Sequence, residues 1–271
     1  MARTGLRVAI GGLGAIGAPP ARALDAGVEG LSLVAVAARD RAKAERTVAG
    51  FRAPPAILSL AGLAEAADIV VEAAPAAVFE EIAAAAVARG RILVPASAGA
   101  LLPRMHLVEE ARRTGARIVV PTGALLGLDA VRAAAEGEVE SVAIETRKPP
   151  RGLEGAPYLV ERGMDVLSVT TPTRVFRGNA FDAARGFPAN VNVAAALALA
   201  GIGAERTMVE IWADPGVTRN THTIRVEAAA ARLTMTIENV PSEENPRTGR
   251  ITSLSILACL RGLTSTLKVG S

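Results

Sequence analysis

The N-terminal part of the chain alternates short apolar runs with alanine-rich segments of helical periodicity. The runs lack the alternation of a half-exposed strand, so they fit strands that are buried on both faces. Helices between such strands imply parallel pairing with right-handed crossovers. The sequence therefore predicts an α/β fold with a doubly wound parallel sheet, whose strands we expect at 6–10, 31–38, 68–74, 91–97 and 117–123.

The pattern changes after Gly123, where apolar and polar residues begin to alternate. A period of two is typical of a strand with one solvated face. Two alanine-rich helical segments, 128–137 and 190–201, lie among these strands. We therefore expect a second, α+β domain with a mixed or antiparallel sheet, built from strands at 139–148, 206–214, 221–229 and 232–240.

Composition narrows the class of protein. Apolar residues make up 50% of the 271 residues, which argues against disorder. Aromatic residues make up only 3%, which argues against a nucleic-acid binder that stacks bases on rings. The formal net charge is only +3, and the basic residues are scattered along the sequence without forming a basic stripe. We expect a small-molecule substrate and no nucleic-acid partner.

The chain shows no sign of secretion or membrane insertion. Its N-terminus lacks the regions of a signal peptide, and charges or prolines interrupt the apolar runs before the roughly 20 residues needed to span a bilayer. The single cysteine, Cys259, lies in an apolar run, where we expect a buried small side chain, and it excludes a disulfide within the chain. We expect a cytoplasmic protein that does not bind membranes.

Three glycines follow the first predicted strand at the spacing G-x-G-x-x-G: Gly12, Gly14 and Gly17. In a strand–turn–helix context the first glycine makes the tight turn, the second lets a pyrophosphate approach, and the third lets the helix pack closely. The helix N-terminus also attracts phosphates. The motif predicts a dinucleotide site of the Rossmann type, in which Ala15 and Ile16 also contact the cofactor.

Two prolines, Pro19 and Pro20, stand where the helix after this motif should already be regular. An interior proline removes a hydrogen bond and costs about 3 kcal/mol, whereas the first helical position tolerates it well. We therefore predict an irregular first turn or a kink, with regular helix resuming at Pro19 or Pro20.

The loop after the second strand bears on the choice of cofactor. The acid that usually binds the adenosine ribose is expected near Ala38, which has no suitable side chain. Asp40 is a candidate from a shifted position, and Arg39 and Arg41 are candidates to bind a 2′-phosphate. We predict that NADP is used at least as readily as NAD; the alternative is a solvated loop that contacts nothing.

The domain boundaries follow from this motif and the change of pattern. Residues 1–123 form the dinucleotide-binding domain, and an apolar C-terminal helical segment, 243–271, is expected to pack back on it. Residues 124–242 are then an inserted domain for substrate, catalysis and dimer contact.

The chain contains only two histidines. His106 lies in an amphipathic helical segment and is expected at the surface, whereas His222 lies on a predicted strand of the second domain. Histidine is the usual acid or base near neutral pH, although a single histidine on a strand is more often structural. No cluster has the spacing of a zinc site, so we expect no metal.

Five segments of the chain resemble the L-aspartate dehydrogenase family. They are PTGALLGLDA (121–130), ETRKPP (145–150), FPANVNVAAALALAG (187–201), ADPGVTRNTHTI (213–224) and ENVPSEENPRTG (238–249). The resemblance implies reversible NAD(P)-dependent oxidation of L-aspartate to iminosuccinate. This product hydrolyses to oxaloacetate and ammonia or supplies NAD biosynthesis. The resemblance also implies a homodimer.

The resemblance also implies roles for residues. It places the catalytic histidine at His222 and cofactor contacts near the nicotinamide at Ala124 and Asn192. A dicarboxylate needs cationic or hydrogen-bonding partners. Candidates for substrate contact are Arg147, Lys148, Arg219, Asn220 and Thr221. Asp129 is expected to cap the helix that follows it.

Two alternatives remain open at this stage. One is a Rossmann dehydrogenase that acts on another amino or hydroxy acid. The other is a non-catalytic NADP-binding sensor, which His222 within RNTHTI argues against because a sensor needs no acid–base group.

Overall fold

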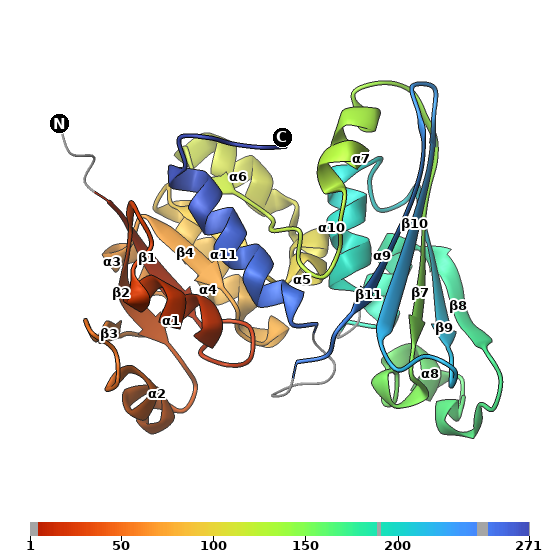
Figure 1. Cartoon of the computed structure of the whole chain (residues 1–271), viewed down its shortest axis with the longest axis horizontal. Coiled ribbons are helices and arrows are strands. Elements are labelled where there is room, and N and C mark those ends of the chain that lie inside the picture. Colours follow the sequence, from red (N-terminus) through yellow and green to blue (C-terminus); the bar gives the residue numbers. More distant parts are fainter. Residues whose placement is uncertain (1–4, 189–190, 243–248, 271) are drawn as a thin grey trace. The chain divides into compact units, whose positions relative to one another are not determined.

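The computed structural model describes residues 5–188, 191–242 and 249–270 (Figure 1). The chain divides into two compact units. Unit 1 comprises Met1–Ser97, Arg104–Pro121 and Thr252–Val269, and unit 2 comprises Ala98–Pro103, Thr122–Ile251 and Gly270–Ser271.

Unit 1 is built on a parallel sheet of six strands in the order β3-β2-β1-β4-β5-β6. The strands are β1 (Leu6–Gly11), β2 (Leu31–Ala37), β3 (Ala56–Ile57), β4 (Ile69–Glu72), β5 (Ile92–Pro95) and β6 (Arg117–Ile118). The doubly wound parallel sheet expected from the sequence is confirmed. Chain order reverses between β1 and β4, and in such sheets ligands bind beyond the carboxyl ends of the strands at this point.

The helices of unit 1 are α1 (Ala18–Ala26), α2 (Arg41–Val48), α3 (Leu63–Ala66), α4 (Phe79–Ala88), α6 (His106–Thr114) and α11 (Ile251–Thr264), with the short η1 (Ala76–Val78). Strand residues such as Val8 and Val71 pack with Leu24 of α1 and with Ile256 and Leu260 of α11 in one core. Of the C-terminal segment expected as a helix, α11 covers 251–264, while 243–248 and 271 lie outside the described residues.

The two prolines lie in the first turn of α1. This helix begins at Ala18, one residue before the expected start, and Gly17 precedes it as the N-cap residue. Residues 14–17 form an irregular turn, in which the Ala18 amide donates to the Gly14 carbonyl over 2.9 Å. The prolines therefore occupy positions whose N–H groups have no helical partner in any case.

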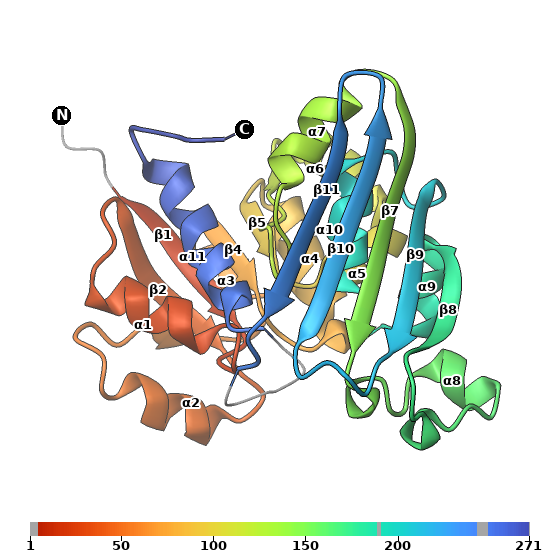
Figure 2. The same ribbon diagram turned by 45° about the vertical axis from the view of Figure 1, so that its right-hand side comes forward.

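Unit 2 contains a five-stranded mixed sheet in the order β11-β10-β7-β9-β8 (Figure 2). Its strands are β7 (Val139–Lys148), β8 (Thr173–Asn179), β9 (Thr207–Ala213), β10 (Asn220–Ala228) and β11 (Arg232–Asn239). Only β7 and β9 pair in parallel, and the other pairs are antiparallel. The expectation of a mixed or antiparallel sheet is thus resolved in favour of the mixed one.

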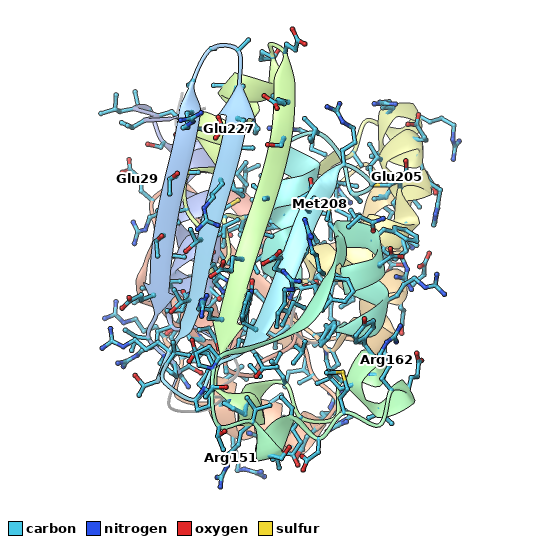
Figure 3. All side chains as sticks on the ribbon, turned by 90° about the vertical axis from the view of Figure 1, so that its right-hand side faces the viewer. Glu29, Arg151, Arg162, Glu205, Met208 and Glu227 are labelled. Atoms are coloured by element: carbon cyan, nitrogen blue, oxygen red, sulfur yellow. The ribbon has the colours of Figure 1, made fainter. Side chains whose placement is uncertain are left out.

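Helices cover one face of this sheet. α7 (Leu128–Ala135), α9 (Ala180–Gly186) and α10 (Asn192–Ala200) pack on the strands, while α5 (Ala98–Leu101) packs against α10 and α8 (Pro157–Glu161) against α9. The short helices are η2 (Leu102–Arg104), η3 (Pro150–Gly152) and η4 (Val166–Ser168). Leu197 of α10 and Val131 of α7 pack against Ile144 and Ile224 of the strands. The opposite face carries polar side chains and is the one seen in Figure 3, where Met208 and Glu227 are labelled.

The expected cap of α7 is wrong. Gly127, with φ +64°, is the N-cap residue and Asp129 lies inside the first turn without capping it. An acidic residue there still interacts favourably with the helix dipole. Within the described ranges, no helix is both long and apolar enough to cross a bilayer.

Candidate functional site

In the glycine-rich turn after β1, the backbone packs so tightly that two of the three glycines have no room for a side chain. Gly12 has φ +104°, and a Cβ placed on it would lie 2.4 Å from the Ala73 carbonyl oxygen. A Cβ on Gly17 would lie 1.9 Å from the Gly12 carbonyl oxygen. At Gly14, by contrast, a Cβ would meet no atom within 4 Å. Two of the glycines are needed for packing, and the third faces open space.

This arrangement fits a dinucleotide. The turn lies at the carboxyl end of β1, where chain order reverses, and leads into the N-terminus of α1. A pyrophosphate needs close access to the backbone at the second glycine and a positive helix end next to it. The open space at Gly14 and the position of Ala15 and Ile16 between β1 and α1 meet both needs.

A buried carboxyl ties together the neighbouring turns at this edge of the sheet. Glu72, the last residue of β4, is fully buried and accepts hydrogen bonds from the Ala74 amide (3.1 Å), the Ser97 amide (3.0 Å) and the Ser97 hydroxyl (3.1 Å). Burial raises the pKa of Glu72 to about 7, and these hydrogen bonds oppose the rise. The turns after β4 and β5 are thus held by one titratable group.

The loop after β2 has the expected charges in exposed positions. Arg39 is exposed, and Asp40 caps α2 by accepting from the Lys43 amide over 2.9 Å. Arg41 forms an exposed ion pair with Glu45. Asp40 therefore already has a structural role, and Ala38 has no polar side chain. Arg39 is left as the exposed charge nearest the end of β2.

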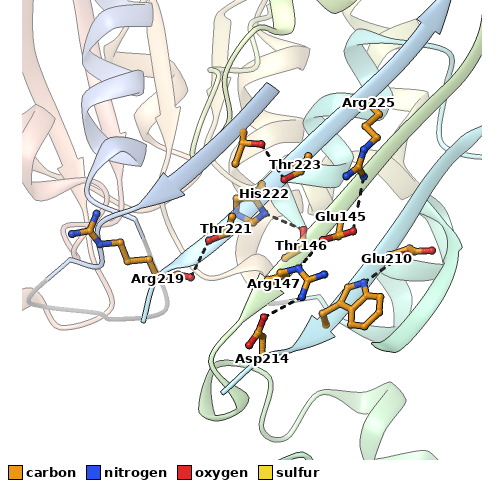
Figure 4. A network of polar contacts seen from close by, with 12 residues as sticks. Glu145, Thr146, Arg147, Glu210, Asp214, Arg219, Thr221, His222, Thr223 and Arg225 are labelled. Atoms are coloured by element: carbon orange, nitrogen blue, oxygen red, sulfur yellow. Dashed lines mark hydrogen bonds and ion pairs between the residues drawn. The ribbon is translucent and has the colours of Figure 1, made fainter. Parts of the chain in front are cut away.

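In unit 2, His222 lies on β10 opposite Thr146 of the neighbouring strand β7. Its Nδ1 atom is 3.0 Å from the Thr146 Oγ1 atom (Figure 4). Lys148 lies two residues beyond Thr146, so alternation along β7 places both side chains on the helix-covered face with His222. All three are buried, with exposed fractions of 3% for His222 and Thr146 and 5% for Lys148.

This environment keeps His222 uncharged. Burial lowers the pKa of His222 to about 3, and the nearby positive charge of Lys148 adds to the effect. The imidazole is therefore neutral throughout the physiological range. The buried lysine can attract a carboxylate of a ligand. The neutral histidine beside it can then donate a hydrogen bond to that ligand or accept a proton from it.

The remaining substrate candidates lie elsewhere on the sheet. Arg147 and Thr221 point to the face opposite His222, because side chains alternate along a strand. Arg147 is paired there with Glu145 (2.7 Å) and Asp214 (3.1 Å), and its guanidinium lies 4.8 Å from the Trp212 ring centroid. These carboxylates already occupy Arg147, so the structure does not bring it together with His222.

Two candidates precede His222 near the start of β10. Asn220 lies on the same face as His222, opposite Asn239 of β11. Arg219 is exposed before the strand, and its carbonyl accepts from the Thr221 hydroxyl at 3.5 Å, a long contact. Asn220 therefore shares the face with the histidine and lysine, whereas Arg219 does not belong to the strand.

The segments expected next to the nicotinamide are each anchored by an asparagine. The Asn239 side-chain amide donates to the Ala124 carbonyl over 3.0 Å, which holds the turn before α7. The Asn192 side-chain oxygen accepts from the Gly99 amide over 3.0 Å and ties α10 to α5. In the described part of the chain, Asn239 Oδ1 is the one fully buried side-chain atom that lacks a hydrogen-bond partner.

Two other residues singled out by the sequence lie away from these groups. His106 is exposed at the start of α6, as expected, 3.5 Å from Glu80. Cys259 on α11 was expected to be buried and is only partly so, packed against the core of unit 1; burial raises the pKa of its thiol to about 11. Within the described ranges, no three His, Cys, Asp or Glu side chains are grouped closely enough to hold a metal.

Known proteins match both parts of the chain. The family described as "Aspartate dehydrogenase, C-terminal" matches residues 129–263. An L-aspartate dehydrogenase of Bradyrhizobium diazoefficiens is 55% identical over 98% of this chain and 94% of its own length. The chain belongs to the L-aspartate dehydrogenase family. A second relative in that family, L-aspartate dehydrogenase 3 of Bordetella bronchiseptica, is 51% identical over 99% of both chains.

A solved structure and a second family agree with this membership. The crystal structure of an aspartate dehydrogenase from Thermotoga maritima superimposes with a TM-score of 0.75 at 26% identity, covering 98% of this chain and 99% of that one. The family "Homoserine dehydrogenase, NAD binding domain" matches residues 12–121. Unit 1 therefore carries the nicotinamide-dinucleotide site, for NAD or NADP, of an aspartate dehydrogenase family member.

Three residues of these sites were missed by sequence reasoning. Thr146, Glu72 and Asn239 make the contacts to His222, Ser97 and Ala124 described above. Each contact joins residues far apart in the chain, so no local motif indicates it. For Glu72 alone there was a local signal, because it is a charged residue at the end of the otherwise apolar strand DIVVE.

Proposed function

We propose that the chain catalyses reversible NAD(P)-dependent oxidation of L-aspartate, with His222 as the residue that acts on hydrogens at the reacting centre. The observation that carries this proposal is the face shared by His222, Thr146 and Lys148 within unit 2. It supplies a neutral imidazole and a cation, which are the groups that a dicarboxylate amino acid requires.

We assign a separate role in the reaction to each of these residues. Lys148, with Asn220 on the same face, binds a carboxylate of the substrate. His222 contacts the nitrogen or oxygen on the carbon that is oxidised. Ala124, held by Asn239, and Asn192, held to Gly99, contact the nicotinamide end of the cofactor.

Unit 1 supplies the phosphate-binding turn. Gly12, Gly14 and Gly17 hold the pyrophosphate, and Ala15 and Ile16 line the same turn. Arg39, with Arg41, attracts a 2′-phosphate, so we propose that NADP is used at least as readily as NAD. When bound, the cofactor would supply the acceptor for a hydride from Cα of aspartate, while the amino group would lose a proton to His222 or water; water would then convert the resulting imine to oxaloacetate and ammonia.

An absorbance assay tests the function. The protein is mixed with L-aspartate and either NAD or NADP at alkaline pH, and formation of reduced nicotinamide is followed. His222→Ala should abolish turnover and leave the dissociation constant of the cofactor nearly unchanged. Turnover that persists in His222→Ala would refute the role given to this residue.

The same assay separates the alternatives. Turnover of another amino or hydroxy acid, without turnover of aspartate, would point to a different Rossmann dehydrogenase. Tight cofactor binding without any turnover would point to a sensor. The buried histidine and lysine on one face count against the sensor, which needs no acid–base group, whereas a dehydrogenase for another amino or hydroxy acid is separated from the proposed function by the assay alone.

Three further properties belong to the same proposal. We propose that the imine product supplies NAD biosynthesis, that the enzyme acts in the cytoplasm and that it is a homodimer. Support for the dimer comes from the open face of the five-stranded sheet, where Met208 is 38% exposed. Sedimentation equilibrium tests the dimer, and a monomer at micromolar concentration would contradict it.

A further inference from the structure

The hydrogen bond between Thr146 and His222 is rigidly placed. β10 pairs with β11 on one side and β7 on the other, and β7 is itself paired with β10 and β9. Both residues therefore lie on interior strands, opposite each other in register. Their 3.0 Å contact joins the Thr146 Oγ1 atom to the Nδ1 atom of a ring that has little freedom to turn.

Hydrogen-bond counting distinguishes the two possible directions of this bond. A hydroxyl carries one hydrogen to donate, and a neutral imidazole carries one N–H and one acceptor nitrogen. In the described part of the chain, Thr146 Oγ1 and the His222 ring contact no other hydrogen-bond partner. If Nδ1–H donated to Thr146, the hydroxyl hydrogen and the Nε2 acceptor would both lack partners.

The opposite direction leaves fewer groups unsatisfied. If the Thr146 hydroxyl donates to Nδ1, only the hydrogen on Nε2 lacks a partner within the described residues. Leaving a buried donor unsatisfied is unfavourable by about 1–3 kcal/mol, so the arrangement with fewer such groups is favoured. Nε2 is not among the fully buried side-chain atoms without a partner in those residues, so it retains some access to solvent or ligand.

We propose that Thr146 is a positioning residue that donates to Nδ1 and holds His222 as the neutral tautomer with its hydrogen on Nε2. The inference rests on the proposed role of His222. It assigns that residue the task of donating a hydrogen bond from Nε2 to an acceptor oxygen of the ligand. The carbonyl of a 2-oxo dicarboxylate has this acceptor chemistry, whereas the ammonium of an amino acid does not.

The charges around the ring agree with a neutral tautomer. Burial and the positive charge of Lys148 hold the pKa of His222 far below neutrality, so the ring does not take a second proton. The other inward positions near it on β10 and β11 carry no charge, and they are Asn220, Ile224, Ile237 and Asn239. The acid on α7, Asp129, is exposed.

Nitrogen NMR of histidine-labelled protein tests the proposal without any turnover. The chain has only two histidines, and His106→Gln identifies the signals of His222. At neutral pH we expect Nδ1 of His222 to show the shift of an unprotonated nitrogen and Nε2 that of a protonated one. A protonated Nδ1 in the wild-type protein would overturn the proposal.

Variants at Thr146 separate positioning from packing. Thr146→Val keeps the shape but removes the hydroxyl, so both tautomers should appear and kcat should fall about tenfold, as expected for loss of one hydrogen bond. The KM for the cofactor should not change. Thr146→Ser should restore the single tautomer and most of kcat.

Thr223→Val is the matched control. Thr223 lies next to His222 on β10, but its hydroxyl pairs with that of Thr236 on the opposite face of the sheet, over 3.1 Å. This variant should leave the His222 signals unchanged. An unchanged tautomer in Thr146→Val would refute the proposal even if activity fell. A correct tautomer without aspartate turnover would instead leave this inference standing and count against the proposed function.

Discussion

Gly17 lies against the Gly12 carbonyl so closely that a Cβ on Gly17 would come within 1.9 Å of the Gly12 oxygen, with backbone on both sides of the contact. Gly14, between them in the same turn, has no atom within 4 Å of the position of a Cβ. The three glycines of one motif thus have different physical roles, and two of them can be separated by experiment.

We expect Gly17→Ala to lower the free energy of unfolding by about 1–3 kcal/mol, the usual range for overpacking. Gly14→Ala should leave thermal stability unchanged but weaken cofactor binding at least tenfold, because the methyl group fills the space that the pyrophosphate needs. Thermal denaturation and calorimetric titration with NADH and NADPH measure the two effects. Equal stability losses in both variants would contradict this division of roles.

The buried carboxyl of Glu72 makes stability depend on pH. Its pKa is raised from 4.5 to about 7, so the folded protein binds this proton more tightly than the unfolded chain. The resulting stabilisation is complete below about pH 4.5 and is lost as the pH rises to about 7. It amounts to about 3–4 kcal/mol, since the pKa rises by about 2.5 units and one unit corresponds to about 1.4 kcal/mol.

Glu72→Gln isolates this contribution, because the amide resembles the neutral acid. The variant should match the wild-type free energy of unfolding near pH 4.5 and exceed it above pH 7, as measured by urea denaturation at each pH. Glu81→Gln, at an exposed position of α4, is the control and should show no such difference. A variant curve parallel to wild type would show that Glu72 is not the titrating group.

The choice between NAD and NADP should respond to the end of β2. Ala38→Asp introduces the acid that binds a ribose hydroxyl and repels a 2′-phosphate. We expect the ratio of kcat/KM for NADP to that for NAD to fall at least tenfold. Asp40→Asn is the control, because asparagine also caps a helix and should preserve α2. If Ala38→Asp leaves the ratio unchanged, the adenosine ribose does not lie at this loop.

Lys148 and Arg147 are adjacent but should differ in function. Lys148→Met removes the cation on the His222 face, so we expect the KM for aspartate to rise more than tenfold. Loss of its positive charge should also raise the pKa of His222, because that charge opposes protonation. NMR titration of labelled histidine measures the shift.

Arg147→Met is the matched comparison. It breaks the ion pairs with Glu145 and Asp214 on the opposite face. We expect a loss of stability of about 1–3 kcal/mol, because the buried Asp214 loses its charged partner, and a KM for aspartate within about threefold of wild type. A larger rise of KM in Arg147→Met than in Lys148→Met would reverse our assignment of the carboxylate-binding residue.

The sequence was most informative where a local pattern has one physical solution. Parallel strands, crossovers and the glycine turn all follow from short-range periodicity and from backbone that admits no Cβ at Gly12 and Gly17. Once 145–148 is taken as part of a strand, the alternation of its side chains also predicts that Arg147 and Lys148 point to opposite faces of the sheet. The start of α1 and the missing cap at Asp129 depend on local backbone angles, which the sequence does not specify to one residue.

Long-range contacts could not be read in this way. Thr146 reaches His222 across 76 residues, and Ser97 reaches Glu72 across 25. Such pairs depend on strand order and register. The amino-acid pattern is compatible with several strand orders and registers, so it does not predict these pairs. The tautomer and charge of the histidine therefore become arguable only in three dimensions.

The path of the chain has a consequence for its biosynthesis. Ile256 and Leu260 of α11 are fully buried in the core of unit 1, although almost all of unit 2 precedes them in the sequence. A ribosome therefore exposes the first strands long before it makes the helix that covers them. The apolar surface of the N-terminal sheet therefore stays uncovered while the second unit is synthesised and can already fold. Chaperone contact during translation should concentrate on that uncovered sheet.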